Sequence, residues 1–173
     1  MKKTLSFILL ISMAFVLCGC SEDFEPIQKD DMRAAIEKYF GYEEGKDFEL
    51  LEDYTLEPTD QQKKNGLKES FELECSIKRI GWDEDPESPF FVYYVFKTKE
   101  EAQEYYNHWK KYEGWGDYHD LDCRYDVNST KGLIDLFGNY YSDRMCFQIY
   151  TLGQEDKDTA IELLESLNLP ATS

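Results

Sequence analysis

An eight-residue stretch in the middle of the chain, residues 71–78, restricts the fold more than any other feature. Apolar residues occupy every second position, and charged or small polar residues lie between them. The apolar positions are Phe71, Leu73, Cys75 and Ile77, and the positions between them are Glu72, Glu74, Ser76 and Lys78. Successive side chains of a β-strand point to opposite faces, so this spacing predicts a strand with one apolar face and one face toward water. Such strands are typical of antiparallel sheets.

Three other segments have apolar positions three and four residues apart, which is the spacing of an amphipathic helix. They are residues 30–40, 99–112 and 155–168. Thr98 and Glu101 have the spacing of a capping box at the start of the second of these segments. We therefore expect three helices, and the second should be capped by Thr98.

Further strands are expected near 47–56, 90–97 and 144–152, where apolar and aromatic residues cluster between turn-forming ones. The strand at 90–97 is apolar on both faces and should be covered on both sides. Residues 57–67 are polar and contain Pro and Gly, which predicts a solvated loop.

The segment before the last strand allows two interpretations. In the first interpretation, a β-hairpin is formed by residues 121–127 and 132–137. In the second, a short helix capped at Ser129 follows the first strand. Two glycines in the segment disfavour a helix, so we favour the hairpin. A turn over residues 138–143 should follow it.

The resulting order is α-β-β-β, α-β-β-β, α. Helices packed on one face of an antiparallel sheet give an α+β domain. Two arrangements fit this order, a ferredoxin-like split arrangement and a duplicated αβββ unit.

The first twenty residues have the pattern of a secretory signal peptide. Lys2 and Lys3 form a basic start, and an almost unbroken apolar run extends over 5–17. A membrane-spanning helix needs about 20 residues, so this run is too short to span comfortably. We expect it to be a cleaved leader rather than a buried helix or a membrane anchor.

Leu17, Cys18, Gly19 and Cys20 close the apolar run. They resemble the lipobox of bacterial lipoprotein precursors, although Cys18 stands where Ala, Ser or Thr is more usual. The resemblance implies that Cys20 receives a diacylglyceryl group, with acyl chains such as palmitate, and becomes the first mature residue. The alternative is cleavage without lipidation.

The resemblance implies the first of three expected parts, a leader over 1–19; the short acidic stretch 20–28 is expected to be a tether and 29–169 a single α+β domain. The resemblance also places the protein on the extracytoplasmic face of a bacterial cell membrane, held by the lipid on Cys20.

The charge of the chain restricts its partners. Removing Lys2 and Lys3 with the leader lowers the 19 basic residues by two, against 36 acidic residues, so the net charge of −17 becomes −19. Such a chain repels the phosphates of nucleic acids and of anionic lipids. We expect a monomer whose partner is a cationic or neutral envelope component, either a protein or a glycan.

The mature chain keeps three thiols besides Cys20. These are Cys75, Cys123 and Cys146, and a disulfide between two of them is possible outside the cytoplasm. For Cys75 we favour a small buried apolar side chain, because it lies on the apolar face of its strand.

One cluster of residues could carry chemistry. Zinc-type ligands lie close together at Asp117, His119, Asp120, Asp122 and Cys123, but their spacing matches no metal motif. The alternative function is therefore an envelope hydrolase or metal-dependent enzyme that uses residues 117–123. We instead expect a binding module that is not an enzyme and carries no cofactor or metal. Its candidate binding surface is the pair of loop tryptophans Trp82 and Trp115.

Overall fold

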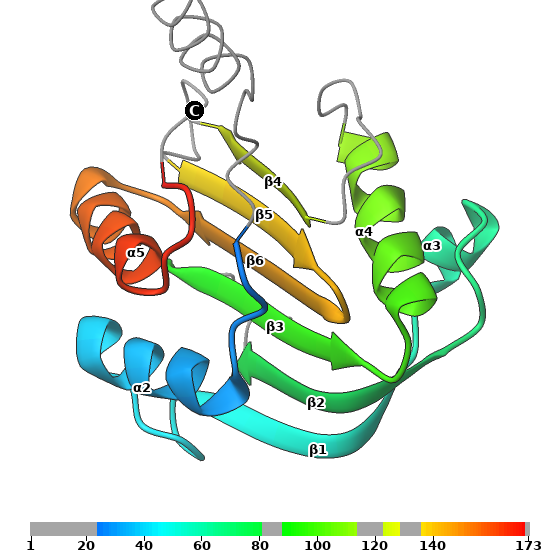
Figure 1. Ribbon diagram of the computed structural model, residues 1–173, viewed down its shortest axis with the longest axis horizontal. Coiled ribbons are helices and arrows are strands. Elements are labelled where there is room, and N and C mark those ends of the chain that lie inside the picture. The colour runs from blue at the N-terminus through cyan, green and yellow to red at the C-terminus, as the bar shows by residue number, and fades with distance from the viewer. Residues whose placement is uncertain (1–23, 81–87, 114–122, 129–135, 172–173) are drawn as a thin grey trace, which may run out of the picture.

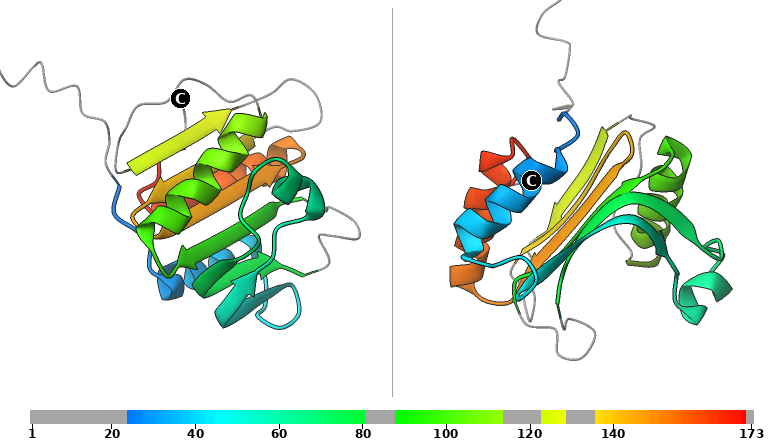
Figure 2. Two further views of the ribbon diagram at one scale, coloured as in Figure 1. Left: turned by 90° about the vertical axis from the view of Figure 1, so that its right-hand side faces the viewer. Right: turned by 90° about the horizontal axis from the view of Figure 1, so that it is seen from below.

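The computed structural model describes residues 24–80, 88–113, 123–128 and 136–171, and for 109–113 and 123–128 only the course of the backbone. The described elements form three layers (Figure 1). A β-sheet lies in the middle, helices α2 (Lys29–Phe40) and α5 (Gln154–Ser166) lie on one face, and α4 (Lys99–Glu113) lies on the other (Figure 2).

The sheet has six strands in the order β1-β2-β3-β6-β5-β4, and every neighbouring pair is antiparallel. The chain is therefore α+β, as predicted. The strands are β1 (Phe48–Leu56), β2 (Phe71–Arg79), β3 (Phe90–Phe96), β4 (Cys123–Asn128), β5 (Leu136–Ser142) and β6 (Met145–Thr151).

The strand order fits a duplicated αβββ unit and not a ferredoxin-like arrangement. Each half is a three-stranded meander that follows a helix, and the halves meet where β3 pairs with β6. The helices do not repeat in the same way, because α4 covers the face opposite to α2. Our expectation of helices on one face is wrong. Strand β3 is apolar on both faces, so both faces of the sheet centre need a cover.

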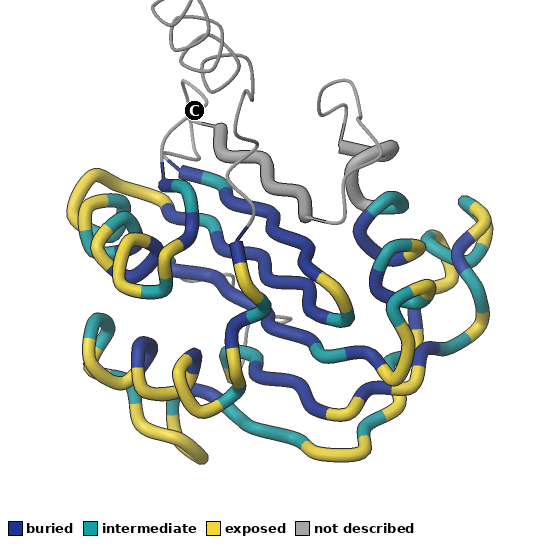
Figure 3. The backbone as a smooth tube through the Cα atoms, viewed as in Figure 1, coloured by how far each residue is buried: buried dark blue, intermediate teal, exposed yellow. Residues whose placement is uncertain are grey.

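Each face of the sheet has its own core, and buried positions run along the central strands (Figure 3). The α2/α5 core contains Met32 and Ile36 of α2 and Leu163 and Leu164 of α5. The α4 core contains Ala102, Tyr105 and Tyr106 of α4. The sheet supplies both cores with aromatic residues. In the α2/α5 core these include Phe48, Phe91, Tyr93, Tyr140 and Phe147, and in the α4 core Phe71, Phe90, Tyr94, Phe96 and Tyr141.

The strict alternation predicted over 71–78 is wrong, because β2 exchanges its two faces halfway along. Leu73 pairs with Phe96 and packs in the α4 core, whereas Cys75 pairs with Val95 and packs in the α2/α5 core. Glu74 is therefore an extra residue relative to β3, which is a β-bulge.

Strand β1 carries a matching irregularity at Asp53. Tyr54 pairs with Leu73 and Glu52 pairs with Cys75, so the register between β1 and β2 is the same on both sides of the bulge. Asp53 has a φ of 47°, which is left-handed backbone. The two strands curl toward the α4 side of the sheet (Figure 2), as bulged strands do.

The hairpin interpretation of the segment before β6 is confirmed, since β4 pairs with β5. Its bounds differ, because β5 extends to Ser142 through the predicted turn at 138–143. Gly138 lies inside this strand, and the position requires glycine because a Cβ there would lie 2.7 Å from a Tyr140 ring carbon. The chain reverses instead at Asp143, which has a φ of 52°.

The helix ends follow their sequence signals in part. The amide of Glu101 donates to the Thr98 hydroxyl at 3.2 Å, but the Glu101 carboxylate binds Lys68 instead of reaching back. The predicted loop 57–67 contains a short helix, α3 (Asp60–Lys64), which is capped by Thr59 and Gln62.

Candidate functional site

The chain enters the folded domain earlier than the predicted tether allows. Phe24 and Ile27 are buried in the α2/α5 core. The Phe24 carbonyl accepts a hydrogen bond from Ser142 at 3.1 Å, and the Ile27 carbonyl accepts one from the Tyr93 hydroxyl at 2.7 Å. Residues 24–28 are therefore a packed strap across the sheet and not part of a tether, and residues 20–23 of the predicted tether lie outside the described residues.

This strap forms one wall of a cleft of about 440 Å³, which we call the bulge cleft. Its other walls are the bulged parts of β1 and β2 and the turn between β5 and β6. The charged residues that line it are Lys29, Glu52, Asp53, Glu74, Asp143 and Arg144. Clefts of this size are typical of small-molecule sites in proteins.

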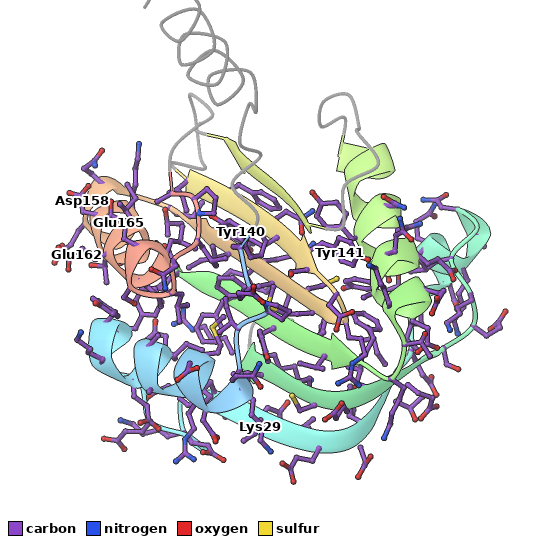
Figure 4. The ribbon with its side chains drawn as sticks, viewed as in Figure 1. Lys29, Tyr140, Tyr141, Asp158, Glu162 and Glu165 are labelled. Carbon is purple, nitrogen blue, oxygen red and sulfur yellow. The ribbon has the colours of Figure 1, made fainter. Side chains whose placement is uncertain are left out.

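Local backbone geometry brings these side chains together. Lys29 begins α2, and in Figure 4 it lies over β1. The paired bulges place Glu52 and Cys75 opposite each other on the α2/α5 side of the sheet. Without the extra residues at Asp53 and Glu74, the side chains beyond the bulge in both strands would point to the opposite face of the sheet.

Ion pairs cross the cleft and its rim. Lys29 binds Glu52, and Arg144 binds Glu74 at 2.6 Å. Lys97, beside the cleft, binds Asp53, and its hydrogen bond lowers the pKa of that carboxyl below its ordinary value. These side chains are substantially exposed, so solvent screens each pair and the pairs contribute little to stability.

Asp143 differs from the other carboxylates of the cleft. Within the described residues it makes no ion pair, although it lines the same wall as Arg144. The lining residues comprise two cations and four carboxylates, which is a net charge of −2.

The floor of the cleft is neutral. Cys75, Val95 and Met145 contribute to it, and Cys75 is only 3% exposed. Burial raises the pKa of the Cys75 thiol to about 11 and also raises the pKa of Tyr93. A thiol with such a pKa is protonated at neutral pH and is a poor nucleophile.

The structure does not place most of the residues singled out by sequence. Trp82, Trp115, Cys20 and residues 117–122 fall outside the described part of the chain. Cys123 begins β4, where only the backbone is described.

The disulfide alternative is wrong. Cys75 and Cys146 are free buried thiols in different cores. Any bridge among the three thiols Cys75, Cys123 and Cys146 would need one of these two.

Sequence reasoning did not find the bulge cleft, because its walls come from separate segments. Lys29 and Glu52 are 23 residues apart in sequence, and Glu74 and Arg144 are 70 apart. The available signal is the pair Glu52-Asp53, which interrupts the apolar pattern of β1 between Leu51 and Tyr54.

Across the described ranges, no three His, Cys, Asp or Glu side chains are grouped so as to hold a metal ion. None of the helices in the described part of the chain has the length and apolar character to cross a bilayer. Comparisons with protein-family models, curated proteins and solved structures found no match to this chain.

Proposed function

We propose that this protein is a lipid-anchored binding module on the extracytoplasmic face of a bacterial membrane. The observation that carries the proposal is the position of Cys20, which ends a lipobox-like sequence four residues before the buried Phe24. Four residues span at most about 14 Å when extended. A lipid on Cys20 would therefore hold the domain, with the bulge cleft beside its strap, close to the bilayer surface.

A binding role fits the cleft better than a catalytic one. Its thiol is held protonated by burial, which disfavours nucleophilic attack. Its charged groups form exposed ion pairs, which a ligand can replace at little cost.

The anchoring is tested by the intact mass of protein extracted from membranes of a bacterial host. The wild type should lack residues 1–19 and carry a diacylglyceryl group. Cys20→Ala should abolish this modification. Cys18→Ala is the matched control, because it changes the neighbouring thiol to a residue usual at that position, and it should keep the lipid. Unmodified full-length protein in the cytosol, or the same lipid on the Cys20→Ala variant, would contradict the proposal.

A further inference from the structure

We propose that the bulge cleft binds a ligand with aliphatic ammonium groups, either a free polyamine or the lysine side chains of a peptide. This inference names a ligand class for the binding module proposed above and rests on that proposed function. The charges of the rim, the spacing of the carboxylates and the neutral floor support it.

The rim of the cleft favours a cation. Asp143 has no ion pair among the described residues, and the lining carries a net charge of −2, which becomes −1 when Lys97, the partner of Asp53, is counted. An ammonium donates three N–H groups, and its hydrogen bonds to carboxylates are charge-assisted. The net charge of the whole chain, −17, further raises the concentration of cations near its surface.

The spacing of the carboxylates favours an organic cation over a metal ion. Glu52 and Asp53 come from β1, Glu74 comes from the β2 bulge, and Asp143 comes from the β5–β6 turn. They line a space of about 440 Å³, and no three of the described acidic side chains converge on a metal position. A chain with separated ammonium groups can reach carboxylates that one ion cannot.

The floor of the cleft suits methylene groups. Cys75 and Met145 are buried there, beside the half-buried Val95. The Cys75 thiol makes no hydrogen bond with any described residue, and the Tyr93 hydroxyl is already bonded to the Ile27 carbonyl. An aliphatic chain on this floor with its ammonium groups at the rim matches both surfaces.

Titration calorimetry on the mature protein purified from detergent-extracted membranes tests the inference. The probes are spermidine and a trilysine peptide at low salt, and the negative probe is trilysine acetylated on its side chains, which keeps the methylenes and loses their charges. We expect at least one of the two cationic probes to bind, and the acetylated peptide to bind at least about tenfold more weakly. Binding of spermidine would show that free amines suffice, and binding of trilysine alone would point to a peptide.

Two variants with the same change of charge separate the cleft from the general acidity of the chain. Asp143→Asn keeps a residue that tolerates left-handed backbone and should weaken binding about tenfold. Glu162→Gln is the control, because Glu162 lies on α5, well away from Lys29 (Figure 4). This variant should weaken binding less than about twofold, because salt screens a charge at that distance. Equal losses in both variants, or binding of neither cationic probe, would overturn the inference.

Cys75 provides a second measurement. A ligand in the cleft should slow alkylation of Cys75 in the native protein, measured over times too short for the enclosed Cys146, on the other face, to react. Unchanged alkylation of Cys75 at saturating ligand would overturn the location of the site. Ammonium binding by a protein that proves to be unlipidated would contradict the anchoring and not this inference.

Discussion

The strands β1-β2-β3 and β6-β5-β4 form two halves of one sheet, and the halves differ in how regularly their side chains alternate. In the second half, β5 and β6 pair without a shift from Leu136 and Thr151 to Ser142 and Met145. Neighbouring residues therefore enter opposite cores, as Tyr140 and Tyr141 do (Figure 4).

Aromatic packing fills both faces of this regular half. The Tyr140 ring stacks on Phe147 with centroids 5.9 Å apart, and the Tyr141 ring stacks on Tyr106 at 5.5 Å. In the first half, the extra residues Asp53 and Glu74 interrupt the same alternation. The charged cleft thus lies where each of two paired strands has one added residue, whereas packed rings fill the regular half.

The largest expected effect tests the face exchange in β2. Ser76 is fully buried, and its hydroxyl makes no hydrogen bond with any described residue. Regular alternation would place it on the solvent face with Glu72 and Glu74. Ser76→Glu should therefore lower the free energy of unfolding by about 3–5 kcal/mol, the cost of an uncompensated buried charge. Denaturant unfolding of the full-length protein measures this change.

Ser76→Ala is the control for this prediction. It removes an unpaired hydroxyl, so the free energy of unfolding should stay within about 1 kcal/mol of the wild type or rise. A Ser76→Glu variant as stable as the wild type would show that Ser76 faces water.

The next effect concerns the regular half. A Cβ at Gly138 would lie 2.7 Å from a Tyr140 ring carbon and 3.2 Å from an Ile149 methyl. Gly138→Ala should lower the free energy of unfolding by about 1–3 kcal/mol through overpacking. Combining it with Tyr140→Leu, which removes the ring, should cost less than the sum of the two single variants. Strict additivity in this double-mutant cycle would contradict the proposed clash.

A smaller effect tests the bulge in β1. Asp53 has a positive φ, and its ion pair with Lys97 is lost in any neutral variant. Asp53→Val should be about 1–2 kcal/mol less stable than Asp53→Gly, because a side chain with a Cβ is strained in left-handed backbone. Denaturant unfolding of the two variants gives the difference directly, and equal stabilities would mean that Asp53 has ordinary strand geometry.

The smallest expected effect concerns the reactivity of the two buried thiols, one in each core, and does not involve stability at neutral pH. Burial raises the pKa of the Cys75 thiol from an ordinary value near 9 to about 11. Because the thiolate is the reactive form, alkylation of native protein at pH 8 should be about 100-fold slower at Cys75 than after unfolding, since each pKa unit is a factor of ten.

The rate at Cys75 should rise with pH until about 11. Cys146, whose pKa is also raised by burial, is fully enclosed in the α4 core and should react only when the protein unfolds. Peptide mapping of alkylated samples by mass spectrometry resolves the two sites, and equal native rates would contradict the different positions of the two thiols.

Sequence periodicity located most elements well, because a helix or strand repeats its apolar positions over many residues. The predicted helix at 30–40 corresponds to Lys29–Phe40, and the predicted strand at 90–97 to Phe90–Phe96. The short helix α3 was missed, although Thr59 and Gln62 have the same capping-box spacing that marked Thr98 and Glu101.

The bulges could not be predicted from the spacing of β2 alone. Glu74 occupies a polar position of a regular alternation, and only its pairing with β3 shows that it is an extra residue. The cleft depends on these bulges and on contacts between distant segments such as the strap and the β5–β6 turn. Its location therefore follows from tertiary structure, whereas the positions of most helices and strands follow from local patterns.

The most direct test of the face exchange is the set of nuclear Overhauser effects from methyl groups of Leu73 and Ile77. These residues are four apart in β2, so regular alternation would place both in one core. The bulge predicts effects from Leu73 to rings of the α4 core, such as Phe96, and effects from Ile77 to rings of the α2/α5 core, such as Tyr93. Effects from both methyl groups to the rings of a single core would contradict the bulge and the cleft that depends on it.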